Sequence, residues 1–184
     1  MEALRQEFGA RLGEGLTLRP LGEEDLPQVL ELYEGNAFYN SVALDRQPDL
    51  ALCREDLEAL PPGKTREEKL FLGVFRQGRL AAVVDLVEGY PQEDTLYLGL
   101  LELQLGEQGK GLGTGLMDGL EGAGRAAGFS FLGLGCLEAN LPGLRFWRSR
   151  GFVEEGRGLW EGRAVHKLKK QLNPEPCKPG DSSL

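Results

Sequence analysis

The chain has 184 residues, of which 41% are hydrophobic and 27% are charged, and this composition predicts a globular protein with a single core. The formal net charge of −8 argues against a broad surface for nucleic acid or for an anionic membrane. It leaves room for a cationic small molecule or a peptide as a substrate.

The three cysteines, Cys53, Cys136 and Cys177, lie far apart in the sequence. Their number is odd and no pair has metal-ligand spacing, so we expect free thiols in a reducing compartment and no metal site. Residues 1–7 carry charges where a signal peptide needs an apolar run, and no apolar stretch approaches membrane-spanning length. We therefore expect a cytoplasmic protein.

The first part of the chain predicts one strand and two well-defined helices. Residues 1–13 suggest a short helix or a loose arm, and residues 16–20 a brief strand. Acidic residues in the first turn favour a helix over 23–35. After a polar stretch over 36–49, a second helix is expected over 50–60.

The rest of the chain predicts strands joined by short turns, with two further helices between them. The expected strands lie at 70–75, 80–87, 95–105, 129–137, 152–153 and 165–168. The expected helices run over 112–127 and from Asn140 to Gly151.

This order of elements predicts a mixed α/β sheet with helices on both of its faces. We expect one domain over 1–170 and a flexible C-terminal tail over 171–184, where Pro, Lys, Asp and Ser dominate. The strand at 95–105 is apolar on both faces at first and alternates from Leu101 onward. That change is typical of a central strand that leaves the core near its end.

A glycine-rich segment, Gln108 to Thr114, lies between this strand and the helix at 112–127. Its glycines let backbone N–H groups converge, and the start of the helix adds partial positive charge, so the segment suits a pyrophosphate. The alternative is a helix whose glycines only allow close packing on the sheet.

Two other phosphate motifs fail at this segment. A nucleotide-binding P-loop needs Gly at position 104 and Ser or Thr after Lys110, where Gln104 and Gly111 stand. A dinucleotide fingerprint needs Gly at 114 or 116, where Thr114 and Leu116 stand.

The segment resembles the signature of the GNAT superfamily of acetyl-CoA-dependent N-acetyltransferases, Gln/Arg-x-x-Gly-x-Gly/Ala, at Gln108, Gly111 and Gly113. The family's second motif places Asn before a helix that ends in Phe-Tyr-x-x-x-Gly-Phe. Here Asn140 precedes a helix that ends in FWRSRGF over 146–152, at the usual separation. The resemblance is strong over 95–155.

The resemblance implies a mostly antiparallel central sheet that splays into a V between the strands ending near Leu105 and Leu137. Acetyl-CoA would be the co-substrate, with its pantetheine arm paired to the backbone of Leu103 and Leu105 and in contact with Asn140. Its pyrophosphate would be bound by the amides of Gln108, Gly109, Lys110, Gly111, Leu112, Gly113 and Thr114.

The implied reaction moves an acetyl group from acetyl-CoA to a primary amine of a small molecule or peptide, by direct attack and without a metal. Glu102 is our candidate general base, because it is a carboxylate on a strand otherwise built of Leu, near the implied acetyl site. Tyr97, on the opposite face of the strand, is weaker. His166 is expected to be an exposed edge residue, and Cys136 a buried structural thiol.

Trp147 stands where the family commonly has a Tyr whose hydroxyl protonates the departing thiolate. An indole N–H can donate a hydrogen bond but is no useful acid, so we expect Trp147 to form an apolar wall at the sulfur end of the cofactor. The alternative function is a CoA-binding regulatory module without efficient catalysis. No nucleic acid or membrane partner is expected, and a homodimer is a possible assembly.

Overall fold

The computed structural model describes residues 1–173. Its strands are β1 (Leu16–Pro20), β2 (Lys69–Arg76), β3 (Arg79–Glu88), β4 (Thr95–Leu103), β5 (Phe131–Leu137), β6 (Val153–Trp160) and β7 (Arg163–Gln171). Its α-helices are α1 (Glu2–Ala10), α2 (Leu26–Gly35), α3 (Ala37–Ala43), α4 (Leu50–Glu58), α5 (Leu112–Ala126) and α6 (Leu141–Ser149). Short 3₁₀ turns lie at Glu23–Asp25, Arg66–Glu68 and Leu105–Glu107.

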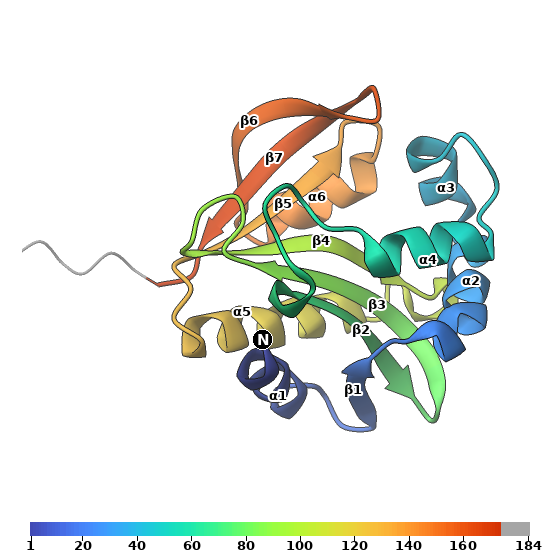
Figure 1. Ribbon diagram of the computed structural model, residues 1–184, viewed down its shortest axis with the longest axis horizontal. Helices are drawn as coiled ribbons and strands as arrows, with labels where there is room; N and C mark the ends of the chain where they lie inside the picture. Colours follow the sequence, from blue (N-terminus) through green and yellow to red (C-terminus); the bar gives the residue numbers. More distant parts are fainter. Residues whose placement is uncertain (174–184) are drawn as a thin grey trace, which may run out of the picture.

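The seven strands form one open sheet in the order β1-β2-β3-β4-β5-β7-β6, and helices cover both of its faces (Figure 1). All neighbouring strands are antiparallel except β4 and β5, which run parallel. The expected mixed, mostly antiparallel sheet with helices on both faces is therefore confirmed.

Each face of the sheet has its own hydrophobic core. The larger core lies between the sheet and α1, α5 and α6, and the smaller one between the sheet and α2 and α4. Side chains along β2 point alternately to the two faces of the sheet. Leu72 and Val74 belong to the larger core, and Phe71 and Phe75 belong to the smaller one. The sheet thus separates α5 on one face from α2 on the other.

The structure differs from the sequence-based expectation at α3 and at His166. The polar stretch 36–49 contains α3, which is only seven residues long and lacks a long apolar period. His166 is only 4% exposed, so the prediction of an exposed edge residue is wrong. The reason is that β6 pairs outside β7, which makes β7 an inner strand.

The end of the described chain still belongs to the sheet. β7 reaches Gln171 and Leu172 is buried, so these two residues of the expected tail pack with the domain. The remainder of that tail from residue 174, together with Cys177, lies outside the described residues.

The helix that follows the glycine-rich segment, α5, is supported from behind by α1. Phe8 of α1 is 1% exposed and belongs to the larger core. Its ring lies so close to Gly119 of α5 that an added Cβ would be 3.4 Å from it. The position of the segment therefore depends on packing between α1 and α5.

We expect Phe8→Ala to lower the free energy of unfolding by about 3–5 kcal/mol, because it leaves a cavity behind α5. Urea denaturation measures the change. Phe38→Ala is the matched control, since Phe38 is 52% exposed and its loss should change stability by less than about 0.5 kcal/mol. Equal effects of the two substitutions would contradict the assigned packing.

Candidate active site

The two parallel strands in the middle of the sheet separate after a short paired segment. Thr95–Leu98 of β4 pair with Phe131–Leu134 of β5, and no pairing continues beyond them. β4 itself continues to Leu103 against β3 on its other side. The sheet therefore opens into the expected V between the ends of β4 and β5.

A β-bulge in β4 marks the point of separation. Leu98 is opposite Leu86 of β3 and Leu100 is opposite Asp85, which leaves Gly99 as an extra residue. Bulges bend a strand and increase its twist locally. The bulge thus coincides with the place where β4 turns away from β5.

Backbone groups of β4 beyond the bulge face the opening. The N–H of Gln104 bonds to the carbonyl of Ala81, so the N–H and C=O of Leu103 face the other way, toward β5. Leu103 thus has the orientation that pairing with an extended ligand requires. Leu105 does not continue the strand, because it begins a 3₁₀ turn and is 58% exposed.

The glycine-rich segment lies at the open end of β4 and begins α5. Gly109 and Gly111 have φ values of 70° and 87°, in the left-handed region that glycine adopts without strain. Gly111 is the N-cap of α5 and has no side chain to cap it, so the first N–H groups of the helix stay available to an outside acceptor. A side chain at Gly109 or Gly111 would meet nothing within 4 Å.

Gly113 joins the loop to both sides of the opening. An added Cβ there would lie 3.7 Å from Leu103 Cδ2 on β4 and 3.6 Å from Phe146 Cζ on α6. The glycine-rich segment is therefore packed between β4 and α6, and its exposed N–H groups would suit an anion.

Comparison with known families identifies this arrangement. A family model described as the acetyltransferase (GNAT) family matches residues 29–152, which is more than half of the chain. The chain belongs to this family. It is accordingly an acetyltransferase, and the resemblance drawn from the two sequence motifs is confirmed.

Solved structures share the fold at low identity. An acetyltransferase from Salmonella typhimurium that modifies the N-terminal serine of ribosomal protein L7/L12 has a TM-score of 0.70 and 18% identity, covering 88% of this chain and 97% of its own. The ribosomal-protein-S18-alanine N-acetyltransferase of Escherichia coli has a TM-score of 0.63 and 16% identity, covering 89% and 97%. The Salmonella typhimurium protein yncA, solved with its cofactor acetyl-CoA, has a TM-score of 0.60 and 19% identity, covering 91% and 99%. A search of curated proteins found no match.

In this GNAT fold, Glu102 lies on the strand beside the opening and faces the smaller core. It is 7% exposed, and its Oε1 accepts a 2.8 Å hydrogen bond from Asn36 Nδ2. Burial raises the pKa of Glu102 to about 8, although the Asn36 hydrogen bond acts to lower it. The carboxyl group thus has a proton affinity suited to acid–base chemistry near neutral pH.

Two more carboxyl groups line the same face. Burial raises the pKa of Asp85 to about 6, despite the ammonium of Lys69 at 3.2 Å from Oδ2. Burial also raises the pKa of Asp56, which accepts a 2.8 Å hydrogen bond from the Tyr33 hydroxyl. The sequence analysis did not predict Asp56 or Asn36 as residues of this site. Their partners, Tyr33 and Glu102, are distant along the chain.

A cavity of about 300 Å³ adjoins the free end of β5. It is lined by Ser41, Val42, Leu137, Glu138, Ala139, Arg163 and Ala164. The cavity thus lies between α3 and the β5 arm of the V.

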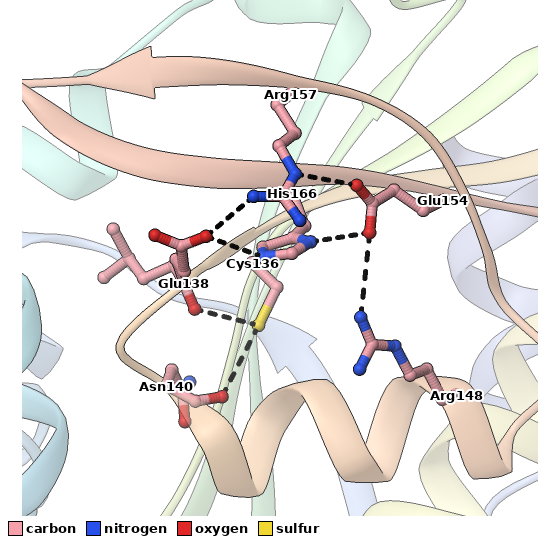
Figure 2. A network of polar contacts seen from close by, with 8 residues as sticks. Cys136, Glu138, Asn140, Arg148, Glu154, Arg157 and His166 are labelled. Carbon is pink, nitrogen blue, oxygen red and sulfur yellow. Dashed lines mark hydrogen bonds and ion pairs between the residues drawn. The ribbon is translucent and has the colours of Figure 1, made fainter.

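The remaining polar candidates are held in structural contacts (Figure 2). His166 Nδ1 lies 2.7 Å from Glu154 Oε2, and its Nε2 lies 3.6 Å from Glu138. Burial raises the pKa of the Cys136 thiol to about 11, as expected for a structural thiol. Asn140 accepts a hydrogen bond from the Gly143 N–H and so caps α6, as its position in the sequence predicted.

Tyr97 lies close to β5 before the opening. Its hydroxyl is 3.3 Å from the position of an added Cβ at Gly135, and burial raises its pKa. The expectation that Tyr97 and Glu102 lie on opposite faces is wrong, because the extra residue Gly99 brings both to the smaller-core face, with Tyr97 leaning over β5.

Within residues 1–173, no group of three or more His, Cys, Asp or Glu residues is placed to hold a metal. In the same range, no helix is long and apolar enough to cross a membrane.

Trp147 lies on the inner side of α6. It is 9% exposed and belongs to the larger core, with ring centroids 4.9 Å from Phe146 and 5.5 Å from Phe152 in edge-on packing. These contacts are apolar and support a packing role for the indole.

We expect Trp147→Phe to keep kcat within about tenfold, or about 1.4 kcal/mol, because an aromatic ring preserves this packing. Trp147→Ala should weaken cofactor binding by opening a cavity, and Trp147→Tyr should raise kcat if its hydroxyl reaches the sulfur. Steady-state kinetics with a working amine measures these effects. A thousandfold loss in Trp147→Phe would show that the indole N–H takes part in the chemistry.

Proposed function

We propose that this GNAT protein transfers an acetyl group from acetyl-CoA to a primary amine of a small molecule or a peptide, with Glu102 as general base. The observation that carries the proposal is the buried Glu102 carboxyl group on β4, beside the opened sheet and with its pKa raised to about 8. A group of this kind takes up a proton more readily than an ordinary carboxylate.

The residues of the opening fit acetyl-CoA. The free N–H groups at the start of α5 and the exposed glycines would bind the pyrophosphate, since their partial charge favours an anion. The N–H of Leu103 faces the opening and would pair with the pantetheine arm, while Leu105 would offer at most a contact from its turn. Asn140 and Trp147, at either end of the inner side of α6, would complete the cofactor site.

In the proposed reaction, the neutral amine nitrogen attacks the thioester carbonyl carbon. A carbon–nitrogen bond forms, the carbon–sulfur bond breaks, and the thiolate leaves with its electron pair. Ionised Glu102 takes, directly or through water, the proton that the ammonium must lose before attack, and the second proton on nitrogen leaves to water or to the departing thiolate. A base is useful because a lysine-like amine with a pKa near 10.4 is almost entirely protonated at pH 7.

The acceptor would enter from the side of α2 and α3. Glu102, Asp85 and Asp56 all face this side, and in their ionised forms they attract a cationic molecule. The cavity at the end of β5 gives it space. Two acetyltransferases of this fold act on ribosomal proteins, so peptides belong in the substrate panel. The present chain is under 20% identical to them, so small amines belong in the panel as well.

We expect CoA and acetyl-CoA each to raise the melting temperature, and Gly111→Asp to abolish the shift by adding negative charge to the anion site. Thermal shift measures binding in each variant. Gly111→Asn is the neutral control of the same shape. Gly162→Asp controls for backbone strain, because Gly162 has a φ of 77° and equally open surroundings on the β6–β7 turn.

A full shift retained in folded Gly111→Asp would place the cofactor elsewhere. Cofactor binding without turnover on any amine would favour the alternative function, a CoA-binding regulatory module, which the absence of the family's Tyr at position 147 suggests.

We expect Glu102→Gln to lower kcat more than it raises the KM for acetyl-CoA, because glutamine keeps the hydrogen bond from Asn36 but cannot take up the proton. In the wild type, kcat should fall below pH about 8, where Glu102 is protonated. The variant should lose that limb and need higher pH for the same rate. A near-normal kcat with an unchanged pH profile would remove Glu102 from the mechanism. Glu31→Gln is the control, because Glu31 lies on the exposed side of α2 and its loss should leave kcat unchanged.

A further inference from the structure

Asn36 occupies the junction between α2 and α3 and is only 6% exposed. It is the C-cap of α2 and the N-cap of α3, yet its side chain makes no capping hydrogen bond to α3. Asparagine is favoured at N-caps because its side chain can satisfy a free N–H of the helix. Here the side chain points instead to the sheet, so its role is not local.

The amide of Asn36 connects three parts of the candidate site. Its Nδ2 lies 2.8 Å from Glu102 Oε1 and 3.0 Å from the carbonyl oxygen of Leu103. Its Oδ1 accepts a 2.6 Å hydrogen bond from Nε2 of Gln108, the first residue of the glycine-rich segment. The same Gln108 nitrogen lies 3.1 Å from the Leu103 carbonyl. Asn36, Gln108 and the Leu103 carbonyl are therefore all bonded to one another, and Asn36 adds Glu102 to this network.

The orientation of this amide is fixed by its surroundings. The Nδ2 group is surrounded by the oxygens of Glu102 and Leu103 and by the Leu32 carbonyl at 3.2 Å. Turning the amide over would place its oxygen against the Leu32 and Leu103 carbonyls, and its NH₂ against that of Gln108.

We infer that Asn36 is a positioning residue, which holds the Glu102 carboxyl group and the Gln108 end of the cofactor loop in one hydrogen-bonded unit. This inference rests on the proposed function of Glu102. It goes further by assigning a role to a residue that neither GNAT sequence motif contains.

Two physical consequences follow for the reaction. The donated hydrogen bond favours the ionised form of Glu102, so without it the pKa of this carboxyl group would rise further above its usual range. Asn36 and Gln108 also satisfy the Leu103 carbonyl, which faces the opening and has no strand partner there. Loss of Asn36 would therefore disturb both the base and the free end of β4.

The test is a double-mutant cycle between Asn36→Leu and Glu102→Gln, with kcat measured from pH 6 to 10, a range of about two pH units on each side of the expected limb. In the wild-type background, Asn36→Leu should lower kcat at pH 7 about tenfold, as the loss of one hydrogen bond to a carboxylate implies. It should also move the acid limb to higher pH. In the Glu102→Gln background, the same substitution should change kcat by less than about twofold, because its effect on kcat passes through Glu102. The lost contacts to Leu103 and Gln108 should instead raise the KM for acetyl-CoA in both backgrounds.

Gln28→Leu is the matched control, since Gln28 is another amide of α2 that bonds to the sheet, at the Leu80 N–H and not at Glu102 or Gln108. It should leave kcat and the pH profile unchanged. Asn36→Ser replaces the leucine variant if that variant fails to fold. An unmoved acid limb, or an equal loss of kcat in both backgrounds, would overturn the role of Asn36. Wild-type kinetics in Glu102→Gln alone would overturn the base itself, and with it this role.

Discussion

Because β4 and β5 share only the pairs from Thr95–Leu98 to Phe131–Leu134, the middle of the sheet is open over the rest of their length. Backbone N–H and C=O groups in a protein interior must find partners, and those of β4 beyond Gly99 have none on the β5 side. Within residues 1–173, side-chain amides meet this need at the Leu103 carbonyl. The rest of that edge remains suited to an extended ligand, as the proposed cofactor site requires.

The opening also explains how groups on two faces of one sheet could act together. The α5 helix packs in the larger core, whereas Glu102 faces α2 on the side of the smaller core. A continuous sheet would separate them by a layer of paired backbone. Where β5 has moved away, Asn36 and Gln108 connect the glycine-rich segment to the Glu102 carboxyl group around the end of β4.

The parts that the sequence predicted are those fixed by neighbouring residues. The glycine-rich segment, the start of α5 and the Asn140 cap follow from backbone conformation and helix-end chemistry over a few positions. Asn36 escaped prediction because its partner Glu102 is 66 residues away, and such a pair has no local pattern. His166 was mispredicted for a related reason, since an inner strand cannot be told from an edge strand until the order β5-β7-β6 is known.

The buried carboxyl groups are costly to the fold, which is itself an argument about their use. Burial disfavours the ionised form, as the raised pKa values of Glu102 and Asp85 show, and an apolar residue at either position would avoid that cost. Asp85 is offset by Lys69, whose ammonium lies 3.2 Å away, so it has a structural explanation. Glu102 instead accepts a hydrogen bond from the neutral amide of Asn36, which orients the carboxyl group without cancelling its charge. A carboxyl group that is oriented but not neutralised keeps a high proton affinity, and this is the property that a general base for an amine needs.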